Sequence, residues 1–276
     1  MTISFVKMHG IGNDFIVIDC RKTALSSQLS ALSKLSRRLC DRRFGIGADQ
    51  ILFLHNSAKA DFRMSIFNAD GSEVEMCGNG IRCFAKYIWD RNLSSKKVLD
   101  IETPAGIIRP EKSGDMVKVD MGVPILEGRQ IPVRLDGVIQ EFPLKILDKR
   151  FKITCVSMGN PHAVIFVDDV AGFNVAKYGP VIENHELFPK RINVEFIQII
   201  SPGTVRMRVW ERGSGETLAC GTGASAAAVA SNLTGRTRKR VKVRLLGGDL
   251  RIDLHKNGHV YMTGPAVEVF EGCINV

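Results

Sequence analysis

Hydrophobic and polar residues alternate in short runs along most of the chain, as they do in strands that bury one face. Stretches rich in glycine, asparagine and aspartate separate these runs and predict turns. In the first half the pattern predicts strands at Ile3–Met8, Phe15–Asp19, Ile51–Leu54, Phe62–Phe67, Val98–Glu102, Gly106–Arg109 and Val117–Met121. In the second half it predicts strands at Thr154–Met158, Ala163–Val167, Asn193–Ile200, Thr204–Trp210, Val241–Leu246, Asp249–Leu254 and Val260–Thr263.

Three other segments have the spacing of helices. Leucines recur through Ser27–Leu39, which predicts a surface helix, and apolar residues recur from Ile81 to Ile88, directly after Cys77. The run Gly223–Ser231 consists of small residues without a charged side chain, which suits a helix buried on all sides. Two segments are less regular: Asp168–Glu186, with at most a short helix, and 124–150, with one or two strands.

The two halves repeat the same order of motifs. A shift of 143 positions places Glu73 on Glu216, Cys77 on Cys220, Gly78 on Gly221 and Gly80 on Gly223. A shift of 147 places Gly12 and Asn13 on Gly159 and Asn160, and a shift of 142 places Gly106 and Arg109 on Gly248 and Arg251. Small changes of shift between blocks are what loop-length differences produce, so the sequence predicts a duplicated domain.

The composition limits the number of domains and the class of protein. With 276 residues, of which 45% are hydrophobic and 24% charged, the chain has room for about two globular domains. No apolar run approaches the ~18 residues of a membrane span, and Met1–Phe5 lacks the pattern of a signal peptide. The seven cysteines include no C-x-x-C pair, so we expect free thiols in the cytoplasm, no disulfides and no metal.

The formal charge of +9 permits weak attraction to anions or nucleic acid. Basic residues are densest in Arg236–Arg244, whose end alternates apolar and basic positions like a strand with one solvated face. No aromatic residue interleaves with them to form a stacking platform. We therefore expect no nucleic-acid partner, although a basic nucleic-acid-binding protein stays an alternative.

The chemistry is concentrated at two helix starts. Cys77 and Cys220 each precede a glycine turn that opens into a predicted helix. Free N–H groups and the positive end of the helix dipole bind carboxylates there and can lower a thiol's pKa. Taken alone, Cys220 is better explained as a small core residue in a tight turn.

The duplication changes that balance. A pseudo-twofold axis between like domains would bring the two helix starts to opposite sides of one bound group. This suits removal of a proton from one face of an amino acid's α-carbon and return of a proton to the other, with one thiolate base and one thiol acid. Helix-end donors would stabilise the charge that develops on the carboxylate.

Six motifs follow one another across nearly the whole chain: Lys7–Phe15, Asn68–Glu73, Cys77–Cys83, Met158–His162, Arg191–Phe196 and Glu211–Thr217. They resemble those of the diaminopimelate epimerases, a pyridoxal-independent family with two cysteines, and the closing Gly264–Ala266 also fits. Trp210 departs from the family pattern, in which tyrosine is expected. The resemblance implies an α/β (α+β) fold of two pseudo-symmetric duplicated domains, each a curled mixed sheet or barrel around a central helix. We expect domains at 1–121, with 266–276 returning to it, and at 122–265, with the active site in the cleft between them.

The resemblance also implies roles for individual residues. Cys77 and Cys220 would be the acid/base pair, and His162 and Glu211 would tune the thiols. The residues that would hold a diamino dicarboxylic acid are Asn13, Gln50, Asn68, Gly78, Asn79, Asn160, Asn193, Glu211, Arg212, Gly221 and Thr222. From the residues alone, Asn13 and Asn160 could simply be turn residues, His162 could satisfy a loop carbonyl, and Glu211 could be a surface charge.

We therefore predict a cofactor-independent isomerase that converts L,L-diaminopimelate into the meso form, in lysine and peptidoglycan precursor synthesis. A distal amino-carboxylate end needs amide, carboxylate and guanidinium partners, and Arg212 is the natural partner for its carboxylate. We expect a homodimer. The nearest alternative is a two-cysteine racemase of glutamate, proline or hydroxyproline, which would not need Arg212 and the asparagine set.

Overall fold

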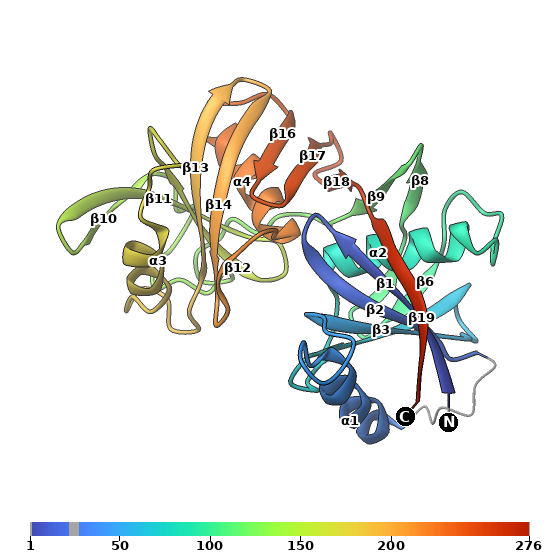
Figure 1. Ribbon diagram of the computed structural model, residues 1–276. Helices are drawn as coiled ribbons and strands as arrows, with labels where there is room; N and C mark the ends of the chain where they lie inside the picture. The colour runs from blue at the N-terminus through green and yellow to red at the C-terminus, as the bar shows by residue number, and fades with distance from the viewer. Residues whose placement is uncertain (1, 22–27, 276) are drawn as a thin grey trace. The chain divides into compact units, whose positions relative to one another are not determined.

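The computed structural model describes residues 2–21 and 28–275. They form two compact units, Met1–Val119 with Gly264–Val276, and Asp120–Thr263. Each unit is a mixed sheet with helices (Figure 1), as the α/β fold class predicted. No helix in the described ranges is long and apolar enough to cross a membrane.

The first unit is built on the strand order β19-β1-β2-β3-β4-β6-β7, with β5 paired to β4. Its strands are β1 (Thr2–Gly10), β2 (Asn13–Asp19), β3 (Gln50–His55), β4 (Phe62–Asn68), β5 (Glu73–Val74), β6 (Ile101–Thr103), β7 (Gly106–Ile108), the hairpin of β8 (Glu111–Ser113) and β9 (Met116–Asp120), which is not part of this strand order, and β19 (Val267–Asn275). Its helices are α1 (Leu29–Cys40) and α2 (Gly78–Asp90). The pairs β2–β3 and β4–β6 are parallel, and the others along this order are antiparallel.

The second unit has the strand order β10-β11-β12-β13-β14-β16-β17-β18, with β15 paired to β14. Its strands are β10 (Phe142–Ile146), β11 (Lys149–Ser157), β12 (Pro161–Phe166), β13 (Asn193–Ser201), β14 (Thr204–Glu211), β15 (Gly215–Thr217), β16 (Arg240–Leu245), β17 (Gly248–Leu254) and β18 (Val260–Gly264). Its helices are α3 (Val175–Glu183) and α4 (Gly221–Leu233). Here β12–β13 and β14–β16 are the parallel pairs.

The two units therefore share one topology. In both units, the first helix connects two strands that pair in parallel, β2 with β3 or β12 with β13. A parallel pair needs a crossover connection of this kind. In both, a two-stranded ribbon (β4–β5 or β14–β15) leads into the central helix. This order confirms the duplication that the repeated motifs predicted.

The central helices begin in the same way. Cys77 and Cys220 occupy the N-cap positions of α2 and α4 with extended backbone angles, and each sulfur accepts a hydrogen bond from the third helical N–H, of Gly80 or Gly223. Every residue of α4 from Gly223 to Ser231 is buried, and the helix packs on β11–β14, β16 and β17. This confirms the prediction of a helix buried on all sides.

Other sequence predictions are confirmed with shifted ends. The first helix begins at Leu29, and Ser27 lies outside the described residues. The strand expected at Val98–Glu102 begins only at Ile101, since Val98 forms a single isolated bridge. The irregular segment Asp168–Glu186 contains α3. Residues 124–150 supply β10 and the start of β11.

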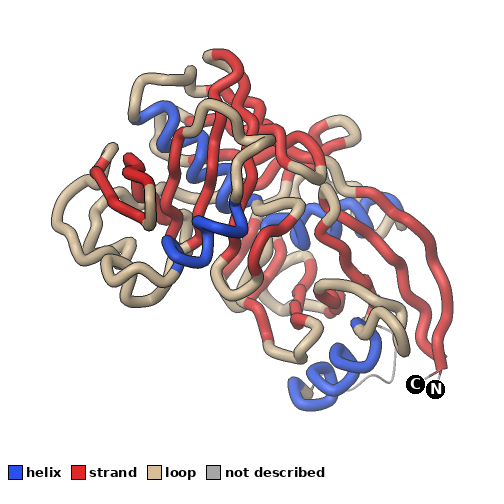
Figure 2. The backbone as a smooth tube through the Cα atoms, turned by 60° about the vertical axis from the view of Figure 1, so that its left-hand side comes forward, coloured by secondary structure: helices blue, strands red, loops and turns tan. Residues whose placement is uncertain are grey.

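Strand β19 was not predicted. It pairs antiparallel with β1 over its whole length, from Thr2 opposite Asn275 to His9 opposite Val267. Figure 2 shows these two strands running side by side toward the two chain ends. The C-terminal segment thereby closes the sheet of the first unit at its edge.

The basic segment Arg236–Arg244 includes most of β16. Its residues alternate between exposed and buried along the strand, which confirms the prediction of one solvated face. Three of its basic side chains form ion pairs, Arg236 with Glu141, Arg240 with Asp253 and Lys242 with Asp249.

Candidate active site

Cys77 lies half-buried at the start of α2. Its sulfur accepts a hydrogen bond from the Gly80 amide over 3.4 Å, and Gly78 and Asn79 behind it are buried. The first-turn amides of a helix lack intrahelical partners, so this end suits an anion.

An amide side chain lies next to this thiol. The Asn13 oxygen accepts hydrogen bonds from the Cys77 thiol (3.8 Å) and from the Asn79 amide (3.2 Å). The Asn13 NH₂ group donates to a carboxylate oxygen of Asp49 over 2.9 Å. The side-chain amide of Asn13 is thus fixed with its oxygen toward the cysteine.

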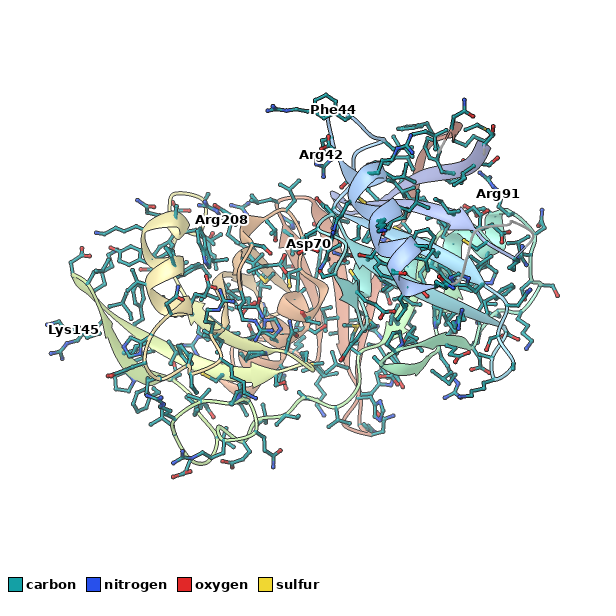
Figure 3. All side chains as sticks on the ribbon, turned by 90° about the horizontal axis from the view of Figure 1, so that it is seen from below. Arg42, Phe44, Asp70, Arg91, Lys145 and Arg208 are labelled. Carbon is teal, nitrogen blue, oxygen red and sulfur yellow. The ribbon has the colours of Figure 1, made fainter. Side chains whose placement is uncertain are left out.

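Asp49, the partner of Asn13, belongs to an ion network with Arg42, Asp14 and Lys7. Asp14 accepts hydrogen bonds from Lys7 (2.6 Å) and from both terminal nitrogens of Arg42 (2.8 and 2.9 Å), and Arg42 also reaches Asp49. Burial alone would raise the pKa of Asp14, but these bonds outweigh it and hold the pKa well below its usual range. Arg42 and the exposed Phe44 project from the loop after α1 (Figure 3).

Two further predicted residues of the first unit pair with each other. Gln50 and Asn68 are opposite partners at the ends of β3 and β4, and the Gln50 NH₂ group donates to the Asn68 oxygen over 2.8 Å. Phe15 on β2 is in register with Gln50. These polar groups therefore lie at the same strand ends as Asn13.

Cys220 is more deeply placed than Cys77. It is 5% exposed, its sulfur accepts from the Gly223 amide (3.3 Å), and it lies 3.5 Å from the Thr222 hydroxyl. Burial raises the pKa of the Cys220 thiol well above its usual value, and the negative charges of Glu211 and Glu195 add to the rise. The expectation of a lowered thiol pKa is wrong for Cys220, because burial and two carboxylates outweigh the helix end.

Glu211 ends β14 beside this thiol. Burial raises the pKa of its carboxyl group, and hydrogen bonds from Thr217 and Cys220 partly oppose the rise. Its Oε1 accepts the Thr217 hydroxyl hydrogen. Glu211 is therefore a half-buried group in contact with the cysteine, and not a surface charge.

His162 is fully buried on β12. One ring nitrogen, Nδ1, lies 2.7 Å from Glu195 Oε1, and the other, Nε2, lies 2.9 Å from the side-chain oxygen of Asn160. The alternative that His162 satisfies a loop carbonyl is wrong, since its partners are side chains. Glu195 received no role from the sequence, although one acidic residue between Val194 and Phe196 in a buried strand is a signal in itself.

Asn193 and Arg212 are joined through the backbone. The Asn193 oxygen accepts from the Arg212 amide (2.9 Å), and its NH₂ group donates to the Pro161 carbonyl (2.8 Å). The Arg212 guanidinium is exposed and donates to the Lys190 carbonyl. Asn193 therefore positions the segment that carries Arg212.

The departure at Trp210 has a local structural role. Its indole N–H donates to Glu183 over 2.7 Å, and Glu183 also accepts from the Gly213 amide over 2.9 Å. The ring packs on Gly179, where an added Cβ would lie 2.6 Å from it. Trp210 thereby ties the loop after β14 to α3.

The fold matches solved structures of isomerases and related proteins. A PhzF-family phenazine biosynthesis protein of Bacillus anthracis aligns with a TM-score of 0.72 at 18% identity over 100% of both chains. A hydroxyproline epimerase of Agrobacterium vitis aligns with a TM-score of 0.67 at 14% identity, over 99% of this chain and 92% of that one. At these identities the likeness shows the fold alone.

Relatives found by sequence are more similar to this chain than these structures are. Residues 5–127 and 154–269 match the protein family described as diaminopimelate epimerase. The diaminopimelate epimerase of Moorella thermoacetica is 54% identical over 97% of this chain and 98% of its own length. That of Carboxydothermus hydrogenoformans is 53% identical over 98% of both. The chain belongs to the diaminopimelate epimerase family and is an isomerase of the amino-acid epimerase class.

Proposed function

We propose that this protein interconverts L,L- and meso-diaminopimelate without a cofactor, in the cytoplasmic synthesis of lysine and peptidoglycan precursors. The observation that carries the proposal is the pair of N-capping cysteines, Cys77 and Cys220, at equivalent helix starts in a family of epimerases. Each sulfur stands at the first turn of a helix, where backbone amides suit a carboxylate. We further propose that the two domains, 1–121 with 266–276 and 122–265, close on one substrate between these helices.

The chemistry divides between the two thiols. One thiolate removes the α-proton, the charge moves onto the carboxylate, and the other thiol delivers a proton to the opposite face. Burial raises the pKa of Cys220 and favours its thiol form, which suits the acid role in this scheme. For the reverse direction, Glu211, in contact with Cys220, accepts the Cys220 proton, and the Cys77 thiolate takes up a proton from solvent. His162 lies close enough to act on the Glu211 charge.

Substrate recognition follows the types of side chain available. The helix starts (Gly78, Asn79, Gly221 and Thr222) would hold the carboxylate at the reacting carbon. The exposed Arg212 guanidinium suits the distal carboxylate, and Glu211 or an asparagine oxygen suits the distal ammonium. Asn13, Gln50, Asn68, Asn160 and Asn193 complete the proposed set.

The test is incubation with L,L-diaminopimelate in deuterated water without pyridoxal phosphate. We expect one deuteron at the α-carbon of the meso product, measured by NMR or mass spectrometry. Proline, hydroxyproline and glutamate in parallel samples test the two-cysteine racemase alternative. Exchange with one of these and none with the diamino diacid would replace the proposed substrate, and exchange with none of them would overturn the proposal.

We also propose a homodimer that forms through β19. This strand is at the edge of its sheet, and Val267, Val269 and Phe270 on it are 42%, 54% and 48% exposed. Long edge strands with exposed apolar residues pair readily with another strand. Light scattering after size exclusion should give twice the chain mass, and Phe270→Lys should shift it toward the monomer. A monomeric unmodified chain would contradict this.

A further inference from the structure

The last residue of α3, Glu183, is a buried carboxylate at the negative end of a helix. Its side chain is 6% exposed, and the dipole of α3 disfavours a negative charge at this end. A buried carboxylate costs stability unless hydrogen-bond donors compensate for the lost water. The reason for its presence therefore lies with its donors, outside the helix.

The donors of Glu183 come from two other segments of the second unit. Its Oε1 accepts hydrogen bonds from the Gly213 amide over 2.9 Å and from the Arg191 guanidinium over 3.2 Å. Its Oε2 accepts one from the Trp210 indole N–H over 2.7 Å. Trp210 and Gly213 come directly before and after Glu211–Arg212 in the chain. One carboxylate thus holds both sides of two residues that we propose for substrate recognition.

The turn 212–214 connects β14 to β15, and each of its three amides donates a hydrogen bond. The first donates to the Asn193 side chain over 2.9 Å, the second to Glu183, and the third to the last carbonyl of β14 over 3.0 Å. Gly213, the middle residue, has a φ of 76°, in the left-handed region that favours glycine. Glu183 therefore fixes the middle of the turn that begins with Arg212.

The first unit holds its equivalent turn in another way. The shift of 143 that aligns the cysteines places Ala69 on Arg212, so that turn carries no guanidinium. There Ser33 and Arg37 of α1 donate to two carbonyls of the turn 69–71, over 2.7 and 2.6 Å. The first helix of each unit thus secures a turn, but the buried carboxylate accompanies the turn that carries an arginine.

The Arg212 guanidinium depends on Glu183 through a second contact. It is exposed and donates to the Lys190 carbonyl over 3.1 Å. The next residue, Arg191, bonds Glu183 through its side chain. Glu183 therefore holds both the turn that carries the guanidinium and the segment that accepts a hydrogen bond from it.

We propose that Glu183 is a positioning residue for substrate recognition, which holds the turn 212–214 and Lys190–Arg191 so that the Arg212 guanidinium faces the distal carboxylate of the substrate. The inference rests on the proposed function and names a residue that selects a diacid over amino acids without a distal carboxylate. Glu183 itself does not contact the substrate, because both of its oxygens accept hydrogen bonds from this chain.

The first test separates the distal end of the substrate from the rest. In Glu183→Gln one oxygen becomes an NH₂ group, so the Gly213 amide or the Trp210 indole loses its acceptor. We expect KM for L,L-diaminopimelate to rise about ten-fold and kcat to stay within about two-fold. The inhibition constant of α-aminoheptanoate, which has the same carbon chain without the distal groups, should stay within about two-fold.

Equal losses for the two compounds would overturn the inference, because a residue that only supports the fold would affect the whole site. An unchanged or lowered KM in a folded Glu183→Gln variant, with an active unmodified chain, would overturn the inference alone. No turnover of L,L-diaminopimelate by the unmodified chain would overturn the proposed function and this inference with it.

A double-mutant cycle tests whether the effect passes through Arg212. Arg212→Ala removes the guanidinium, and we expect kcat/KM to fall by on the order of 100-fold. Adding Glu183→Gln to it should change kcat/KM by less than about two-fold, since no guanidinium is left to position. Independent effects of the two substitutions would overturn the inference.

Glu183→Asp separates geometry from charge. Aspartate keeps the negative charge but is one methylene group shorter, so it does not reach the Gly213 amide and the Trp210 indole together. We expect KM to rise as in Glu183→Gln. A KM equal to that of the unmodified chain would mean that the charge alone matters, and would overturn the inference.

A matched control weakens α3 at its other end. The Asn174 side chain caps the helix by accepting a hydrogen bond from the Lys177 amide over 3.0 Å. Asn174→Ala should lower the melting temperature by about 2–4 °C and leave KM unchanged. A KM defect as large as that of Glu183→Gln would overturn the inference, because a less stable helix would then be a sufficient cause.

Discussion

The two central helices begin with the same backbone and the same cap, yet their surroundings are opposite in character. Cys77 is half-buried beside amide groups and above two apolar side chains. Cys220 is buried beside Glu211 and Glu195, and its burial together with these two charges raises its pKa. Duplication supplied two equivalent thiols, and the side chains around them make the thiols different. The two-base chemistry proposed above would use this difference, because one thiol is charged while the other is not.

The largest expected effect on activity comes from removing each thiol in turn. Cys77→Ala and Cys220→Ala should each lower epimerisation by more than about 1,000-fold, because each proton transfer loses its only carrier. Deuterium incorporation from solvent measures the epimerisation activity of both variants.

A paired control is Cys83→Ala. Cys83 lies in α2, fully buried and off the helix start, and we expect that variant to keep near-normal activity. Near-normal activity in either of the first two variants would contradict the two-base scheme.

The next prediction concerns the charges at Cys220. A neighbouring negative charge raises a thiol's pKa, so Glu211→Gln should lower the pKa of Cys220. Alkylation of Cys220, followed by mass spectrometry across a pH series, should then begin at lower pH in the variant. Cys77, alkylated in the same samples, is the internal control, and an equal shift at both cysteines would contradict the local cause.

Much of this comparison could be predicted from the sequence. The shift of 143 aligned the two caps, and the small residues of Gly223–Ser231 correctly indicated a buried helix. These features depend on local spacing, which sequence reports well.

The electrostatics could not be predicted in the same way. The pKa of Cys220 depends on its depth and on Glu195, which is 25 positions away along the chain and belongs to a different element. Glu195 stands among apolar residues of a strand, and the sequence alone does not show that His162 lies on the adjacent strand to receive it. Strand β19 was missed because apolar and polar residues do not alternate regularly along Val267–Asn275.

The smallest expected effect compares the two glycines beneath the caps. At Gly80 an added methyl group would approach Phe15 and Leu52 at 3.3–3.4 Å, which neighbours can absorb by shifts of a few tenths of an ångström. At Gly223 it would lie 2.7 Å from Glu195 Oε1 and 3.2 Å from the Cys220 sulfur, so the buried carboxylate must move. We expect Gly80→Ala to change the free energy of unfolding by less than about 0.5 kcal/mol, as the better helix propensity of alanine offsets the tight contact. Gly223→Ala should lose about 1–2 kcal/mol, since it disturbs a buried hydrogen bond.

Urea denaturation of both variants measures these values. Combining Gly223→Ala with Glu195→Leu, which shortens the obstructing side chain, should restore part of the loss. The same Glu195→Leu change has no reason to rescue Gly80→Ala, because the two sites lie in different units. Equal losses at the two glycines would mean that the space beneath the helix does not distinguish the units, and the contrast between an apolar and a charged support would then have to be given up.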